Sequence, residues 1–182
     1  MQCKLLKGIG MKSVLVVVLT VVTLGSGMAK AKHRIGEHFG GGTVFYVDSA
    51  GEHGLIAADS DQGMRIRWNS GANMLTNATG DGVGAGAANT KLIIGLHGPG
   101  IYAAALCSAY HGGGFTDWYL PSKAELNLLY MKKNLFGGFL DCYYWSSTEY
   151  VSYDAWNQSF GQGDQFGGSK EYPGGIRAVR AF

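Results

Sequence analysis

Charged side chains and cysteines are scarce in this chain of 182 residues. Only 15% of the residues are charged and three are Cys, whereas 12% are aromatic. A disordered chain is excluded, because so many rings bury enough apolar surface to offset the entropy lost on folding. The 30 glycines do not recur at every third position, which excludes a collagen triple helix. The length fits one globular domain.

Several motifs that would indicate a defined chemistry are missing. No C-x-x-C pair is present, and the five His residues are scattered without an H-E-x-x-H pair, so we predict no redox or metal site. No G-x-S-x-G follows the N-terminal leader, which argues against a serine hydrolase. Residues 82–87 match a relaxed dinucleotide fingerprint, but a strand–turn–helix context is lacking, so we expect a turning loop there and no cofactor.

The N-terminus has the pattern of an export signal. Lys4, Lys7 and Lys12 precede an apolar run over residues 14–24, and Ala29-Lys30-Ala31 follows it. The run is too short for a membrane-spanning helix, which needs about 20 residues. We predict a signal peptide over residues 1–31, starting at Met1 or Met11, and a single domain over residues 32–182. The protein would then be secreted, periplasmic or at the cell surface, with no membrane anchor after cleavage.

The net charge follows from the same leader. Four Lys residues lie in it and all 13 acidic residues lie beyond it, so cleavage turns the formal charge of +2 into a small negative one. The remaining basic residues form isolated pairs rather than a stripe. We therefore expect no nucleic-acid partner.

Two cysteines, Cys107 and Cys142, remain after removal of the leader. In an oxidising compartment such a pair most simply forms one disulfide, which would stabilise the fold by about 3 to 4 kcal/mol. Two buried free thiols are the alternative. We predict the disulfide.

The hydrophobic periodicity predicts strands at both ends of the domain and helices between them. A hairpin is expected over residues 43–58, a long polar loop over 59–89, and strands over 143–147, 155–160, 165–170 and 176–182. Helical segments are expected over 91–96, 101–110 and 123–133. The last begins with the capping box Ser122 and Glu125. The fold class is therefore α+β, with the N-terminal hairpin and C-terminal strands forming sheets around central helices.

Separated motifs in this order resemble the Lcl C-terminal domain family, named for a bacterial collagen-like adhesin. They are GDGVGAGAANT at 80–90, GGFTDWYLPSKAEL at 113–126, YWSSTE at 144–149 and RAVRAF at 177–182. The resemblance implies a C-type-lectin-like fold and a glycan-binding or adhesive role. Two features depart from this family pattern. No collagen repeat is present. The Trp-Asn-Asp triplet of calcium-dependent lectins is incomplete, because Trp156-Asn157 is followed by Gln158, so we do not expect calcium-mediated sugar binding.

Aromatic residues crowd the C-terminal strands and their turns. Strand alternation places Tyr143 and Trp145 on one face, which we assign to the core. Proteins that bind sugars stack aromatic rings on the C–H faces of the sugar and accept hydrogen bonds from its hydroxyls with carboxylates. Tyrosines in turns beside carboxylates, and those carboxylates, are therefore the candidate ligand contacts. They are Glu149, Tyr150, Tyr153, Asp154, Asp164 and Tyr172.

These observations favour a non-catalytic binding module for a glycan or another cell-surface ligand. Two alternatives stay open: a hydrolase of an envelope polymer, using a pair of the acids, and a purely structural envelope domain. Convergent carboxylates in a cleft would favour the enzyme, and an open surface lined by tyrosines would favour binding. The sequence leaves the oligomeric state open.

Overall fold

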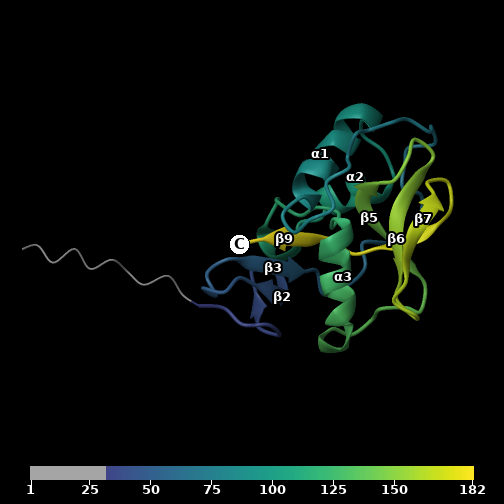
Figure 1. Ribbon diagram of the computed structural model, residues 1–182. Coiled ribbons are helices and arrows are strands. Elements are labelled where there is room, and N and C mark those ends of the chain that lie inside the picture. Colours follow the sequence, from purple (N-terminus) through teal and green to yellow (C-terminus); the bar gives the residue numbers. More distant parts are fainter. Residues whose placement is uncertain (1–31) are drawn as a thin grey trace, which may run out of the picture.

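A computed structural model describes residues 32–182, and the predicted signal peptide lies outside the described residues. Strands occupy both ends of this part of the chain and helices its middle, so the predicted α+β class is confirmed (Figure 1). The strands are β1 (His38–Phe39), β2 (Gly42–Val47), β3 (Gly54–Ala57), β4 (Gly63–Ile66), β5 (Tyr143–Glu149), β6 (Asp154–Ser159), β7 (Gln165–Ser169), β8 (Gly174–Ile176) and β9 (Val179–Ala181). The helices are α1 (Gly86–His97), α2 (Ala103–Ser108) and α3 (Lys123–Met131), with short 3-10 turns η1 (Gly112–Gly114) and η2 (Lys133–Leu135).

The strands form two sheets, with the orders β1-β2-β3-β9 and β4-β8-β5-β6-β7. The last strand, β9, pairs antiparallel with β3, so the chain end returns to the first hairpin as the sequence predicts. Helix α3 contacts β2 of the first sheet and β5 and β6 of the second, and Figure 1 shows it between the two. The helix thereby joins the two sheets into one body.

The first hairpin is buried on both faces. Val44 and Phe45 are both enclosed, and the register of β2 against β3 shifts between Val44 and Tyr46. Such a bulge re-aims a side chain. Because successive residues of a strand point to opposite faces, Val44 packs with Ile56 in one apolar cluster and Phe45 packs with Leu126 in the other.

The capping box at the start of α3 is formed as predicted. The Ser122 hydroxyl accepts from the Glu125 amide at 3.3 Å, and the Glu125 carboxylate accepts from the Ser122 amide at 2.8 Å. Glu125 also accepts from the Gly84 amide at 2.7 Å, and burial raises its pKa. A Cβ at Gly86 would lie 2.3 Å from this carboxylate, so glycine there lets α1 begin against α3.

The predicted disulfide is wrong, because Cys107 and Cys142 are both free. Cys107, in α2, is fully buried in the cluster that contains Trp68 and Trp118. Cys142 precedes β5 and packs against the other cluster, beside Phe160. The two side chains are thus held in different apolar clusters.

Three further expectations need correction. The segment 59–89 is not a continuous loop, since it contains β4, which pairs with β8. Helix α1 begins five residues earlier than the predicted 91–96 segment. The predicted strand over 176–182 is two short strands, β8 and β9, which belong to different sheets.

Candidate functional site

A row of three side chains crosses the second sheet. Trp145 of β5 lies directly opposite Asn157 of β6, and Asn157 lies directly opposite Phe166 of β7. Opposed residues project from the same face of a sheet, so the three share one face, as do Tyr143 and Gly168 by alternation. The opposite face carries Gln158 and Gln165, which bond to α3 through Asn127 and Lys123. The row therefore lies on the sheet face directed away from α3.

This row lines a hollow of about 260 Å³, which we call the aromatic cavity. Its lining is Tyr143, Trp145, Asn157, Phe166, Gly168, Tyr172, Pro173 and Gly174. Trp145 is buried, but the other rings are open to solvent: Tyr143 is 51% exposed, Phe166 38% and Tyr172 70%. Tyr143 and Phe166 meet edge to face at 5.1 Å. The assignment of Tyr143 to the core is thus wrong, although its shared face with Trp145 is correct.

Glycines leave room around the indole of Trp145. A Cβ at Gly174 would lie 2.8 Å from Nε1 of Trp145, and a Cβ at Gly168 would lie 2.3 Å from Nδ2 of Asn157. Nε1 donates to the Ile66 carbonyl at 3.0 Å, which fixes the ring on the β4 side of the sheet. The two glycines keep the cavity free of side chains above Trp145 and Asn157.

Asn157 supplies the polar group of the aromatic cavity. The residue is only 5% exposed, and its Oδ1 is buried without a hydrogen-bond partner in the described part of the chain. An unpaired buried acceptor is destabilising by about 1 to 3 kcal/mol unless a donor reaches it. This side chain therefore has capacity for a hydrogen bond that the protein does not satisfy.

Two further hollows adjoin the aromatic cavity. The middle hollow, about 520 Å³, shares Tyr143 with it and is lined also by Asp141, Cys142, Ser159, Gly161 and Gln162. The outer hollow, about 420 Å³, shares Asp141 with the middle one and extends past Phe139 and Asn134 to Lys133. Tyr143 therefore borders both the aromatic cavity and the middle hollow, and Asp141 borders both the middle and the outer hollow.

The predicted ligand contacts are dispersed over the sheet. Tyr172 lines the aromatic cavity, whereas Tyr150 packs at 5.1 Å against Trp156, a residue that alternation puts on the other face. Tyr153 is exposed in the turn between β5 and β6, next to Asp154 at the start of β6. Asp164 precedes β7 in the turn after β6. Of the six predicted residues, Tyr172 is the one that the structure places in this cavity.

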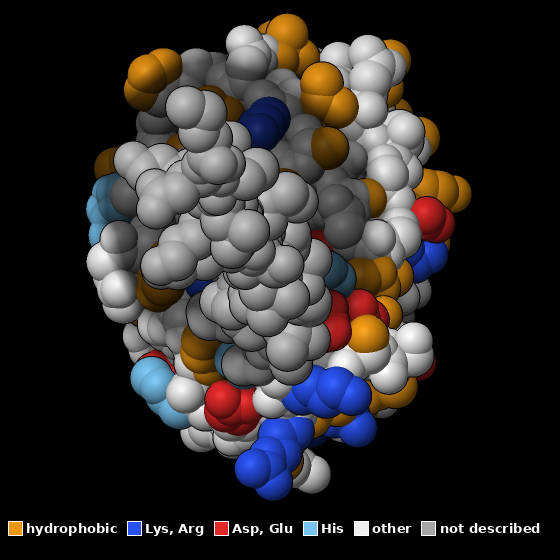
Figure 2. Space-filling view, turned by 90° about the vertical axis from the view of Figure 1, so that its left-hand side faces the viewer, with side chains coloured by type: hydrophobic (Ala, Val, Ile, Leu, Met, Phe, Trp, Pro, Cys, Tyr) orange, Lys and Arg blue, Asp and Glu red, His pale blue; other side chains and the backbone are white. Residues whose placement is uncertain are grey.

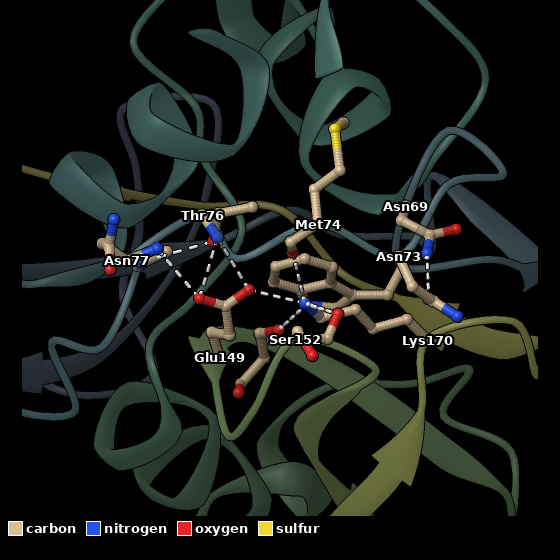
Figure 3. Close-up of polar contacts among 11 residues, drawn as sticks. Asn69, Asn73, Met74, Thr76, Asn77, Glu149, Ser152 and Lys170 are labelled. Atoms are coloured by element: carbon tan, nitrogen blue, oxygen red, sulfur yellow. Dashed lines mark hydrogen bonds and ion pairs between the residues drawn. The ribbon is translucent and has the colours of Figure 1, made fainter. Parts of the chain in front are cut away.

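Glu149 is enclosed in a polar network at the end of β5 (Figure 3). Its Oε1 pairs with Nζ of Lys170 at 2.5 Å, and both side chains are fully buried. Glu149 also accepts from the amides of Thr76 and Asn77, while Lys170 donates to the carbonyls of Met74 and Ser152. Burial lowers the pKa of Lys170, against the effect of Glu149. The pair ties residues 74–77 to the second sheet.

Two more carboxylates are held by arginines. Asp61 accepts from Nε of the buried Arg177 at 2.6 Å and from the Tyr144 hydroxyl at 2.8 Å. Asp117 makes a two-point contact with Arg180, at 2.7 and 2.9 Å, which holds the pKa of Asp117 below its usual value. The carboxylates of Asp61 and Asp117 therefore serve mainly to join separate segments of the fold.

Neither a metal-binding group nor a membrane-spanning helix is present among residues 32–182. No group of three or more His, Cys, Asp or Glu side chains is placed there to hold a metal ion. None of the helices in this range has the length and apolar character needed to cross a membrane. On the face in Figure 2, Lys and Arg side chains lie near Asp and Glu side chains along the lower edge, so the charge there is mixed.

The chain matches a protein-family model, whereas no curated protein matches it. The matching model is described as the Lcl C-terminal domain and covers residues 58–180. This range includes all three hollows and the Glu149–Lys170 network, and it bears out the resemblance drawn from the motifs.

Proposed function

This chain belongs to the Lcl C-terminal domain family, and from that premise we propose that it is an exported, non-catalytic, adhesin-like module. Its ligand is a glycan, bound at the aromatic cavity. The export signal predicted at residues 1–31 supports a place outside the cytoplasm. The return of β9 to the first hairpin supports the C-type-lectin-like architecture that the family resemblance implies.

The observation that carries this proposal is the combination of open rings and an unpaired amide in one cavity. Tyr143, Phe166 and Tyr172 present apolar faces to solvent, and Asn157, whose enclosed Oδ1 has no partner among the described residues, lines the same cavity. A sugar ring has apolar C–H faces that pack on aromatic rings and hydroxyls that donate to acceptors. Binding sites of this kind combine apolar walls with a few placed polar groups.

The alternatives have less support. A hydrolase of the envelope polymer would need two carboxylates facing one substrate bond. Asp61, Asp117 and Glu149 are instead paired with Arg177, Arg180 and Lys170. A purely structural domain gives no reason for three rings to stay open around a buried unpaired acceptor.

The test is a glycan array probed with the purified protein, with and without EDTA, followed by titration of the best ligand. Tyr172→Ala and Phe166→Ala should each weaken binding about tenfold, because each removes a ring at the centre of the contact. EDTA should have no effect. Tyr153→Ala removes an exposed ring that does not line the cavity and should bind as the unchanged protein does.

Two results would count against the proposal. One is that the protein binds no glycan on the array even though it unfolds cooperatively and is therefore folded. The other is equal loss of binding in Tyr153→Ala and Tyr172→Ala, which would place the ligand elsewhere.

A further inference from the structure

The structure assigns the aromatic cavity to one class of sugar, namely an uncharged unit that carries an N-acetyl group. This inference rests on the proposed function, and it adds which part of a glycan enters the cavity. Three properties of the cavity carry it: its size, the chemistry of its walls and the unpaired amide of Asn157.

The aromatic cavity has room for one sugar unit rather than for a stretch of saccharide chain. Its volume of about 260 Å³ equals that of roughly nine molecules of liquid water. Sites for drug-sized ligands are larger, at about 300 to 1,000 Å³. Trp145 is buried in the wall, whereas Tyr143 and Tyr172 are exposed, so a single unit enters from the side of the two tyrosines.

The walls disfavour a charged ligand. The described residues that line the aromatic cavity include no Lys, Arg, Asp or Glu. A carboxylate or sulfate group enclosed there would lose its water without gaining a counter-charge, which is strongly unfavourable. Acidic groups are normally held by Arg and Lys side chains. The unit that enters the cavity is therefore neutral.

The same walls favour a methyl group over a set of hydroxyls. Most of the lining is apolar, and it consists of Tyr143, Trp145, Phe166, Tyr172 and Pro173. Nε1 of Trp145 already donates to the Ile66 carbonyl and is not free for a ligand. A hydroxyl enclosed among these groups would lose hydrogen bonds to water and regain few, whereas a methyl group gains free energy by leaving water. An N-acetyl group brings such a methyl.

Asn157 supplies the polar partner for the rest of the N-acetyl group. Its Oδ1 is enclosed and unpaired, and its Nδ2, which is not enclosed, has no hydrogen bond to the described residues either. A Cβ at Gly168 would lie 2.3 Å from Nδ2, so glycine there leaves space for the amide. The acetyl carbonyl accepts one hydrogen bond and needs no acceptor in return. Nδ2 therefore donates to that carbonyl while the methyl group packs on the rings.

The experiment titrates the purified protein with methyl glycosides that differ in one substituent. The neutral pairs are N-acetylglucosamine with glucose and N-acetylgalactosamine with galactose. Sulfated N-acetylglucosamine and N-acetylneuraminic acid are the charged probes, and both keep the acetyl group. We expect each neutral N-acetylated sugar to bind about tenfold more tightly than its plain hexose and than either charged probe.

One substitution separates the amide from the rings. Asn157→Leu keeps the approximate size of the side chain and removes its amide, so the preference for N-acetylated sugars should fall to about twofold. The unfolding midpoint should not fall, because an unpaired buried acceptor is lost. Asn134→Leu makes the same change at an exposed residue outside the aromatic cavity and should keep the preference. If Asn157→Leu does not fold, the matched sugar pairs decide the question in the unchanged protein.

The outcomes distinguish this inference from the function on which it rests. Equal affinity for N-acetylated sugars and plain hexoses, or tighter binding of the charged probes, would overturn the inference and leave glycan binding in place. The same holds if folded Asn157→Leu keeps the full preference, or if the protein binds glycans on the array but none of the N-acetylated glycosides. No binding of any sugar, on the array or in titration, would overturn both.

Discussion

His97, at the end of α1, is a half-buried residue whose environment disfavours its charged form. Its ring packs against Trp68 and Tyr102, its Nδ1 lies 3.1 Å from the Ser70 hydroxyl, and its Nε2 is buried without a hydrogen-bond partner among the described residues. Burial lowers its pKa, and the positive charge of Lys170 lowers it further. His97 therefore binds a proton less readily in the folded protein than in the unfolded chain.

This difference predicts how stability responds to pH. Below about pH 6.5 the unfolded chain binds more protons at His97 than the folded chain, so the free energy of unfolding falls as the pH falls. His97→Gln should remove this part of the pH dependence, while His111→Gln, at an exposed histidine, should keep it. Urea unfolding at pH 7.5 and pH 5.5 measures the difference. Identical pH dependence in the two variants would contradict the prediction.

The start of α3 shows how much one local signal contributes at the scale of an element. Ser122→Ala removes the acceptor for the Glu125 amide and also the hydroxyl that donates to the Gly82 carbonyl at 2.7 Å. We expect the free energy of unfolding to fall by about 1 to 2 kcal/mol. Ser49→Ala, in the exposed turn after β2, is the control. Equal urea midpoints for the two variants would show that the cap does not contribute.

Elements defined by local chemistry could be predicted from the sequence, and elements defined by tertiary pairing could not. The capping box of α3 and the hairpin over residues 43–58 depend on neighbouring residues, and both are present. Strand β4 has only four residues, begins with Gly63, and contains Arg65 with a φ of 60°, so its extended form depends on pairing with β8. Helix α1 begins at Gly86, where close packing against Glu125 outweighs the poor helix propensity of glycine.

The candidate site follows the same division. Alternation correctly places Tyr143 and Trp145 on one face. Tyr172, predicted as a ligand contact, lines the aromatic cavity. The row of Trp145, Asn157 and Phe166 depends on the register of three strands, which the sequence does not specify. Glu149 has the sequence context of a ligand contact, but Lys170, 21 residues further on, encloses it in an ion pair. Such a partner becomes visible only when β5 and β7 are placed.

At the scale of the whole molecule, the topology keeps the two thiols apart. Cys107 lies in a helix that packs under Trp68, whereas Cys142 lies at the entry to β5, beside Phe139 and Phe160. Burial raises the pKa of both thiols, which disfavours the reactive thiolate. The chain can therefore retain both of these cysteines unpaired, because its packing holds each in a separate apolar cluster.

This separation gives a prediction about reactivity. In the native protein, iodoacetamide should modify half-buried Cys142 slowly and leave fully buried Cys107 unmodified, and both should react at once in urea. A reducing agent should not change the unfolding midpoint, since no cross-link constrains the unfolded chain. Mass spectrometry of the alkylated protein measures the modification of each cysteine. In the control variant Cys142→Ser, Cys107 is the remaining one of these two thiols, so any native labelling at this pair reports on Cys107. The prediction is wrong if the native mass is lower by two hydrogens and neither cysteine is alkylated in urea. That result would show a disulfide between Cys107 and Cys142, and the two residues would then lie closer together than this packing allows.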